Sequence, residues 1–179
     1  MFADKDLEAV LERIGPDARQ EIQLQKFGAQ LDTILRSNKF YQKKFGQVGV
    51  SDAADILSME DFSALPVTTK TELAEDQIAY RPYGSNMTFS LDRYTKIHQT
   101  SGTTGEPLRC LDTDESWEWW ANCWTAVYRA AGVTPLDRVF FAFSFGPFIG
   151  FWSAYEGARR FGALAVPGGG MSSFQRLQA

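Results

Sequence analysis

The segment that decides the fold runs from Thr100 to Pro107 and reads TSGTTGEP. Its two glycines, Gly102 and Gly105, permit backbone conformations closed to other residues and let a ligand approach the main chain. Successive backbone N–H groups in such a loop can point into one concavity, which favours an anion. The hydroxyl side chains that add further donors are Thr100, Ser101, Thr103 and Thr104. No carboxylate comes before Glu106, so the loop suits a polyphosphate, and a plain hairpin turn rich in Gly, Thr and Ser explains the same residues.

Two better-known phosphate loops do not fit this segment. A Walker loop needs a glycine, four residues and then Gly-Lys, but the count from Gly102 reaches Pro107 and no lysine follows. The dinucleotide fingerprint needs a helix directly after its glycines. Residues 108–111, LRCL, instead predict a strand.

A second predicted strand precedes the loop. Residues 93–100, RYTKIHQT, favour β structure, and we expect Tyr94 and Ile97 to be its core anchors. With the strand over 108–111, this predicts a hairpin whose connection is the glycine-rich loop itself.

Residues 1–90 are predicted to form a mainly helical region. Apolar residues recur at helical spacing over 7–14 and again over 17–36, with a break in the period at 38–41. Short helical turns and loops are expected over 46–66, with Met59, Phe62 and Leu65 as anchors. Thr69 and Glu72 then have the spacing of a capping box, which predicts a helix start and no chemistry.

Residues 91–179 are predicted to hold the phosphate loop and a parallel-sheet α/β region of the same large domain. A helix should begin at 112–115 and end at Gly132. Its expected core stripe is Trp117, Trp120, Ala121, Trp124, Val127, Tyr128 and Ala131. Strands over 139–143 and 163–167, each an apolar run typical of burial on both faces, flank a helix over about 148–161. This is a βαβ unit, so the fold class is α/β.

The last predicted helix begins at Ser172 and has few residues before Ala179. A helix so short, beside a sheet with an open edge, predicts that the chain is truncated or that a partner chain covers the edge.

Composition excludes several classes of function. The formal net charge of -4 and the pI of about 5.1 argue against nucleic-acid and membrane binding. Cys110, Cys123 and the single histidine, His98, are too few for a disulfide framework or a four-ligand zinc site. No signal peptide is recognisable at the start of the chain, and the apolar stretch 139–152 is too interrupted to span a bilayer. We therefore expect a cytoplasmic protein with free thiols and without a metal site of its own.

Residues 100–107 also match a family signature. They resemble the phosphate-binding motif of adenylate-forming enzymes, in which Ser or Thr, Ser, Gly, Ser or Thr, Thr, Gly and any residue precede Pro. Most members continue with lysine, whereas Leu108 stands here, which resembles the phenylacetate-CoA ligase branch. The segments 40–41 (FY), 65–70 (LPVTTK) and 143–150 (FSFGPFIG) are similar to that branch as well. The resemblance covers nearly the whole chain but only about the first two-fifths of a typical member.

The resemblance implies an ATP-dependent carboxylate-CoA ligase that acts through an acyl-adenylate, with an aryl or arylacetic acid as substrate. ATP, Mg²⁺ and coenzyme A are the implied cofactors, and a small-molecule carboxylic acid is the implied partner. The residues implied to grip the β- and γ-phosphates are Thr100, Ser101, Gly102, Thr103, Thr104 and Gly105. Phe143, Phe148 and Gly150 are implied to shape the acid pocket, although strand and helix packing explains them too. No catalytic residue is assigned, because the family's later motifs and its C-terminal lysine are not in this sequence.

Three alternatives stay open at this point. The chain could be a non-catalytic nucleotide-binding module, or it could be a subunit of a split enzyme or an interaction protein. The third alternative keeps the fold of the family with an acid that is not aromatic. A homodimer and a pairing with a C-terminal part both agree with the sequence. In the ligase interpretation, we expect the 179 residues alone to bind ATP weakly and not to turn over.

Overall fold

The structure is a computed structural model that describes residues 13–102 and 106–179. It divides into two compact units, Met1–Phe89 and Ser90–Ala179, which are described separately below. The helix predicted over 7–14 falls almost entirely outside the described residues. That the two units belong to one large domain stays a prediction.

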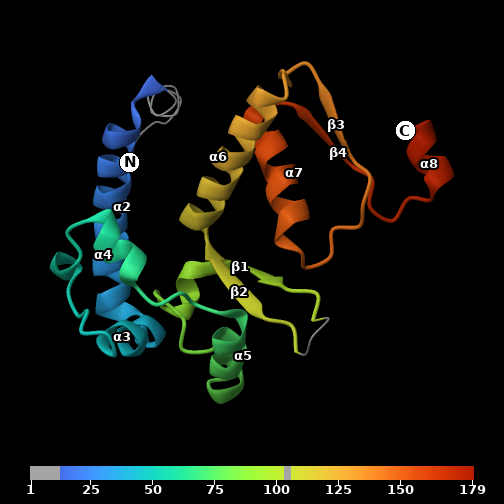
Figure 1. Cartoon of the computed structure of the whole chain (residues 1–179). Helices are drawn as coiled ribbons and strands as arrows, with labels where there is room; N and C mark the ends of the chain where they lie inside the picture. The colour runs from blue at the N-terminus through green and yellow to red at the C-terminus, as the bar shows by residue number, and fades with distance from the viewer. Residues whose placement is uncertain (1–12, 103–105) are drawn as a thin grey trace. The chain divides into compact units, whose positions relative to one another are not determined.

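The first unit is helical, as its sequence predicts (Figure 1). Its elements are α2 (Pro16–Ser37), α3 (Lys39–Gly46), the 3-10 turn η1 (Ala53–Asp55), α4 (Met59–Ala64) and α5 (Lys70–Ala79). The break expected after α2 is a cap rather than the end of helical structure, because the Asn38 side chain accepts a hydrogen bond from Tyr41 N at 3.2 Å. The capping box of Thr69 and Glu72 is confirmed at the start of α5.

The core of this unit gathers around one buried leucine. Leu31 is fully buried and forms a cluster with Phe45 and Ile56. Of the expected anchors, Phe62 packs edge-on against Phe27 with ring centroids 4.2 Å apart. Leu65 packs against the same cluster, and Met59 is half-buried.

A buried lysine joins α3 to the start of α5. Lys44 is 9% exposed and donates to the Val67 carbonyl at 2.7 Å and to a carboxylate oxygen of Glu72. Glu72 also accepts from Thr69 N at 2.7 Å, so one carboxylate both caps a helix and pairs with the lysine. The hydrogen bond from Lys44, and after it those from Thr69, lower the pKa of Glu72 from 4.5 to about 2.

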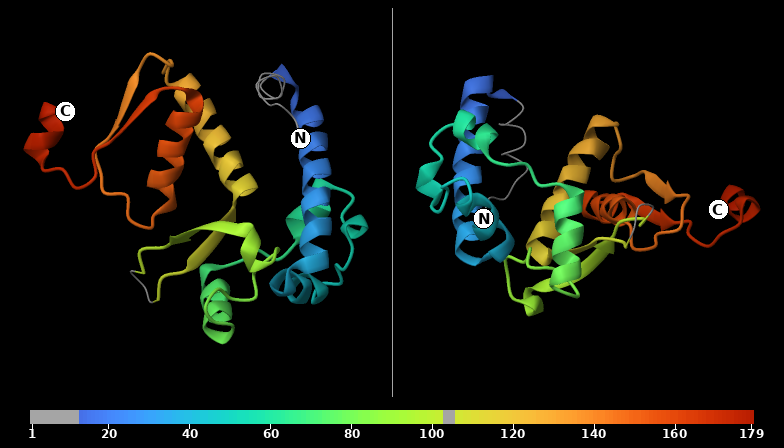
Figure 2. Two further views of the ribbon diagram at one scale, coloured as in Figure 1. Left: turned by 180° about the vertical axis from the view of Figure 1, so that it is seen from behind. Right: turned by 60° about the horizontal axis from the view of Figure 1, so that its bottom comes forward.

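The second unit contains a hairpin and a βαβ unit (Figure 2). Its elements are the 3-10 turn η2 (Leu91–Arg93), β1 (Tyr94–Gln99), β2 (Arg109–Thr113), α6 (Asp114–Ala130), β3 (Arg138–Phe141), α7 (Ile149–Phe161), β4 (Leu164–Pro167) and α8 (Ser173–Gln178). β1 and β2 pair antiparallel, with His98 opposite Cys110. β3 and β4 pair in parallel, with Phe140 opposite Val166. The predicted hairpin, βαβ unit and α/β fold class are confirmed.

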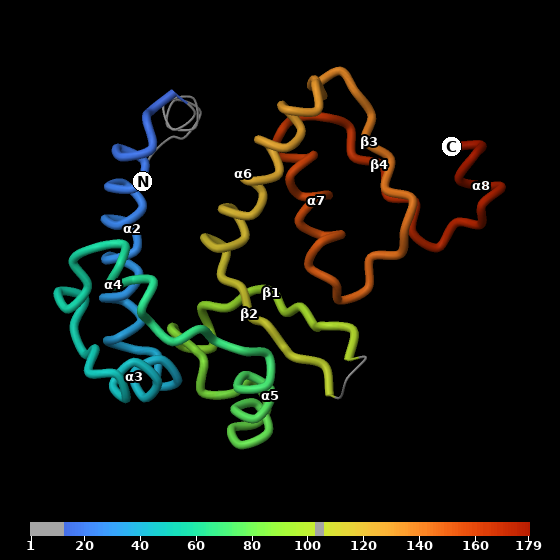
Figure 3. The backbone as a smooth tube through the Cα atoms, viewed as in Figure 1, coloured from blue at the N-terminus to red at the C-terminus, as the bar shows by residue number. Residues whose placement is uncertain are grey.

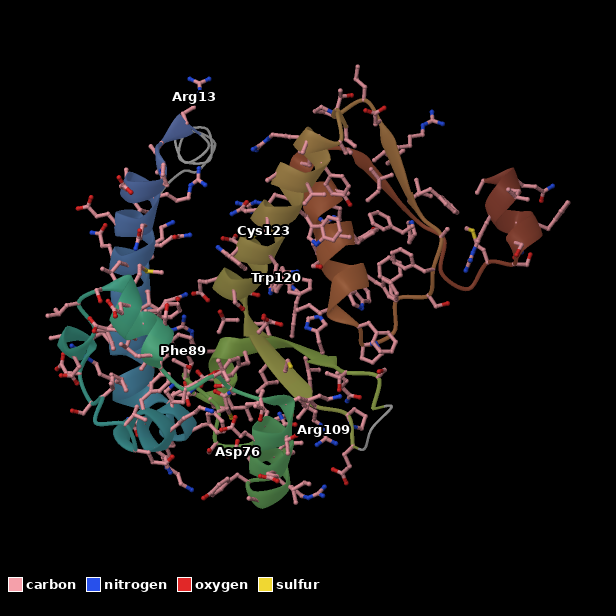
Figure 4. The ribbon with its side chains drawn as sticks, viewed as in Figure 1. Arg13, Asp76, Phe89, Arg109, Trp120 and Cys123 are labelled. Carbon is pink, nitrogen blue, oxygen red and sulfur yellow. The ribbon has the colours of Figure 1, made fainter. Side chains whose placement is uncertain are left out.

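Three details of the predicted core are wrong. Ile97 is 44% exposed, because an odd spacing from Tyr94 puts the two side chains on opposite faces of the strand, and His98 is the buried residue at 5%. Trp120 and Val127 are 37% and 52% exposed, because the face of α6 that meets α7 is narrower than its apolar stripe. Figure 4 shows Trp120 and Cys123 on α6. The parallel strands are not buried on both faces, since they form a two-stranded sheet in which Leu164 is 58% exposed.

Small residues bring α6 and α7 into close contact. The α7 residues buried at this interface are Ser153, Ala154, Gly157 and Ala158. Trp124 Nε1 donates to Ser153 Oγ at 2.9 Å, and the Tyr128 hydroxyl donates to the Ala154 carbonyl at 2.9 Å. A Cβ added at Gly157 would lie 2.2 Å from the Trp124 Cβ, so the contact requires glycine.

We expect Lys44→Gln to lower the thermal unfolding midpoint by a few degrees at neutral pH, because it removes the charge that Glu72 is paired with. A lowered pKa stabilises the fold fully above the unfolded value of 4.5, and this contribution disappears as the pH falls from 4.5 to about 2. The difference in thermal unfolding midpoint between the variant and the unsubstituted chain should therefore shrink as the pH falls through that interval. Lys43→Gln, at the exposed neighbouring position, is the control and should show no such narrowing.

Gly157→Ala should destabilise the second unit by about 1–3 kcal/mol, because the added methyl group forces the two helices apart. Gly28→Ala is the matched control, since Gly28 lies inside α2 with no atom within 4 Å of an added Cβ. That change should stabilise the first unit by about 0.5–1 kcal/mol. Urea unfolding measures both, and equal effects of the two substitutions would contradict the close contact.

Candidate functional site

Hydrogen bonds join the two residues at which the predicted phosphate loop leaves the strand pair and returns to it. Thr100 N donates to the Leu108 carbonyl at 3.0 Å, and Leu108 N donates to Thr100 Oγ1 at 3.0 Å. These two bonds close the mouth of the loop. The Thr100 hydroxyl acts here as an acceptor, so its own proton remains available to a further acceptor. Thr100 therefore has a structural task in addition to the role predicted for it.

The described part of the loop is accessible. Ser101 is exposed, and Gly102 has a φ of +67°, a left-handed conformation that favours glycine. Glu106 and Pro107 on the return side are exposed as well. Thr103, Thr104 and Gly105 lie outside the described residues, so their grip on a phosphate stays a prediction.

A second loop follows β3 and meets the hairpin. Residues 142–148 leave the C-terminal end of β3, and the Pro147 carbonyl accepts a hydrogen bond from Gln99 N at 2.8 Å. Gln99 is the last residue of β1, directly before the phosphate loop. Trp152 Nε1 on α7 donates to the Gly146 carbonyl at 2.7 Å and holds the same loop from its other side.

A third loop, residues 168–170, follows β4 and packs on the second (Figure 3). Gly168 N donates to the Phe141 carbonyl at 2.9 Å. An added Cβ at Gly168 would lie 2.7 Å from the Phe140 ring, and one at Gly169 would lie 3.1 Å from the Phe143 carbonyl. Both loops leave the carboxyl ends of parallel strands, which is where open α/β sheets bind their ligands.

The structure brings two of the three predicted acid-pocket residues onto one ring. Phe143 stacks on Phe151 with centroids 4.1 Å apart, and Phe148 meets the same ring edge-on at 6.1 Å. Phe148 is 40% exposed. Gly150 lies in the first turn of α7, exposed and with open space beside it. Their role in binding an acid stays a prediction, since Phe143 also packs against Phe141 and Phe145 in the core of this unit.

A buried polar pair lies beneath the hairpin, and the sequence does not predict its pairing. His98 Nδ1 lies 3.0 Å from Asp112 Oδ2, and the imidazole stacks on Trp117 with centroids 4.8 Å apart. The sequence predicts a strand at His98 and a helix start at Asp112. The register puts both at the inner side of the strand pair, and only a register prediction could have brought them together.

The described residues offer neither a cluster of metal ligands nor a membrane-spanning helix. Residues 13–102 and 106–179 contain no group of three or more His, Cys, Asp or Glu side chains placed to hold a metal ion. The same part of the chain has no helix with the length and apolar character needed to cross a membrane. Cys110 and Cys123 are both unbridged.

Comparison with known proteins gives relatives but no matching protein-family model. The chain is 30% identical over 168 residues to a phenylacetate-coenzyme A ligase of Escherichia coli (strain K12), covering 94% of this chain and 37% of that protein. It is 28% identical over 176 residues to the phenylacetate-coenzyme A ligase of Pseudomonas putida, covering 98% of this chain and 39% of that protein. The chain thus spans less than two-fifths of the length of these relatives.

Solved structures share the fold. A 2-hydroxyisobutyryl-CoA ligase in complex with 2-HIB-AMP and CoA, in the thioesterification state, superposes with a TM-score of 0.83 and 30% identity. The match covers 89% of this chain and 34% of that one. The same ligase in an open conformation, again with 2-HIB-AMP and CoA, gives 0.82 and 28%.

We expect Thr100→Val to loosen the mouth of the loop, because the buried Leu108 N–H loses its hydroxyl acceptor. At about 1 kcal/mol for such a bond, the Leu108 amide should exchange about fivefold faster with deuterium. Thr100→Ser keeps the hydroxyl and is the control. Unchanged exchange in the valine variant would show that the loop is closed by other contacts.

Proposed function

We propose that this chain, a homologue of phenylacetate-CoA ligases with the fold of acyl-CoA ligases of the adenylate-forming superfamily, supplies the polyphosphate-binding hairpin and part of the acid-binding wall of an ATP-dependent carboxylate-CoA ligase. The observation that carries the proposal is the backbone hydrogen bond from Gln99 to Pro147. This bond joins β1, which leads into the hydroxyl-rich loop, to residues 142–148, the aromatic loop that follows β3.

The reaction proposed for the whole enzyme has two steps. A carboxylate oxygen attacks the α-phosphorus of ATP, the bond to the β-phosphate oxygen breaks, and an acyl-adenylate and pyrophosphate form. The sulfur of coenzyme A then attacks the acyl carbon, the bond to AMP breaks, and a thioester forms as the thiol proton is released. The first step needs donors that spread the charge of the leaving pyrophosphate.

The hairpin offers hydroxyl and amide donors for that charge. Ser101 is exposed, the Thr100 proton is available, and Gly102 leaves its amide unshielded by a side chain. Leu108 occupies the place where most adenylate-forming enzymes carry lysine, so hydroxyls and amides would have to bind the phosphates here. Because the described residues offer no cluster of metal ligands, we assign no Mg²⁺ ligand to this chain, and the ion that accompanies ATP stays a prediction.

The aromatic loop favours an aryl or arylacetic acid as the substrate. Phe143 and Phe148 present two rings around Phe151, and a substrate ring could add to such a cluster edge-on or offset. The relatives are named for phenylacetate, whereas the solved structures are of an enzyme named for an aliphatic hydroxy acid. The acid class is therefore a separate question for experiment.

We expect the 179 residues to bind Mg-ATP and Mg-pyrophosphate weakly but saturably, with amide signals of Ser101 and Gly102 shifting in ¹H–¹⁵N NMR. The variant Thr103→Ala/Thr104→Ala lacks two hydroxyl donors. Its affinity for both ligands should be at least about tenfold lower, because each lost hydrogen bond goes to a charged oxygen. Adenosine, which lacks phosphates, is the control ligand, and its affinity should be the same for the variant and the unsubstituted chain.

The same spectra test the acid. Phenylacetate should shift signals of the aromatic loop, and 2-hydroxyisobutyrate should shift them less. Identical affinity of the loop variant for pyrophosphate would contradict the proposed polyphosphate site. Equal responses to the two acids would contradict only the choice of an aromatic substrate.

A further inference from the structure

The end of β1 rests on a polar pair that is withdrawn from solvent. His98 and Asp112 have side chains 6% and 12% exposed, and His98 Nδ1 lies 3.0 Å from Asp112 Oδ2. A carboxylate oxygen can only accept, so Nδ1 carries the hydrogen of this bond. Ser116 Oγ, in the first turn of α6, lies 3.1 Å from the other carboxylate oxygen. The pair therefore links β1, β2 and α6.

A stacked indole supports the same strand. The rings of His98 and Trp117 are nearly parallel, at 14°, with centroids 4.8 Å apart. Lys96, two residues earlier on β1, holds its ammonium group 4.7 Å from the centre of the Trp117 ring. Trp117 is 5% exposed, and its Nε1 has no hydrogen-bond partner among the described residues. The indole thus contacts two side chains of β1, those of His98 and Lys96.

Stability alone does not account for a buried polar pair at this place. Well-packed apolar side chains commonly fill such a space with equal or greater stability, so a buried ionic or polar pair is weak evidence for a stabilising role. A hydrogen bond, unlike an apolar contact, has a direction and fixes the ring at one angle. The residue so fixed lies two positions before Thr100, where the loop begins.

We propose that His98 is a positioning residue for the polyphosphate loop. Its contacts with Asp112 and Trp117 fix the last residues of β1. Gln99 N can then donate to the Pro147 carbonyl, and the Thr100–Gly102 segment presents its donors to the phosphates. His98 touches no reacting atom in this scheme. The inference rests on the proposed function, because it assigns a task to His98 only if the loop binds a polyphosphate.

The experiment compares four variants with the unsubstituted chain, using Mg-pyrophosphate as the probe. His98→Phe keeps a ring on Trp117 and removes the hydrogen bond, whereas Asp112→Asn keeps an acceptor for Nδ1–H. His98→Phe/Asp112→Leu removes both polar groups, which restores a satisfied interior. Thr95→Val is the control, because Thr95 makes an exposed bond of 2.6 Å to Asp114 from the opposite face of the same strand. Affinity is measured by NMR well below each variant's thermal midpoint, so that all chains are folded.

We expect Asp112→Asn and Thr95→Val to bind pyrophosphate within about twofold of the unsubstituted chain, and His98→Phe to bind about tenfold more weakly. The decisive variant is the double one, which should regain thermal stability and still bind about tenfold more weakly. If it regains both stability and affinity, His98 is merely structural and the inference is wrong. If the unsubstituted chain binds no pyrophosphate, the proposed function fails first, and this inference fails with it.

A second readout needs no variant. His98 is the only histidine of the chain, so its imidazole gives one unambiguous pair of ¹⁵N signals. They should show a hydrogen on Nδ1, and adding Mg-pyrophosphate should shift them although the ring is buried. A ring with its hydrogen on Nε2 alone, or signals that ignore saturating pyrophosphate, would overturn the inference.

Discussion

The site depends on two neighbouring backbone N–H groups that point in opposite directions. Thr100 N donates inward across the hairpin to Leu108, and Gln99 N donates outward to Pro147. Successive residues of a strand offer their backbone groups to opposite edges, so β1 can pair with β2 and still bind the loop after β3. The predicted phosphate loop therefore follows a residue pair whose backbone is held on both sides. Every later element of the candidate site is placed relative to that point.

Close contacts at glycine backbones hold other parts of the second unit together in a similar way. Gly168 and Gly169 let the loop after β4 lie against the end of β3, where any side chain would strike a ring or a carbonyl. Gly157 does the same where α7 crosses α6. The aromatic side chains that remain are crowded into the space between these contacts, with Phe141 at 4% exposure at their centre. Such packing orients the rings of the aromatic loop with little freedom.

Most of the fold could be predicted because its signals are local. The helix caps at Thr69 and Gly162, the strands on either side of residues 100–107 and the apolar runs of the βαβ unit each show in a few neighbouring residues. The errors come from pairings that sequence does not show. Ile97 was assigned to the core because it is apolar, whereas the register turns His98 inward, and the partner of His98 is fourteen residues away. Lys44 finds Glu72 across twenty-eight residues for the same reason.

The predicted site stays a prediction, and the structure adds contacts around it that the sequence does not show. Thr100 was expected only as a donor to phosphate, yet its hydroxyl also closes the hairpin through Leu108 N. Leu108 is itself 5% exposed, so its side chain belongs to the interior, where a lysine would have to bury its aliphatic stem. At the position where most adenylate-forming enzymes carry lysine, this chain thus has an apolar side chain that packs at the mouth of the loop. In the proposed function such a loop binds phosphate through hydroxyls and amides, whose direction is fixed by the strands that carry them.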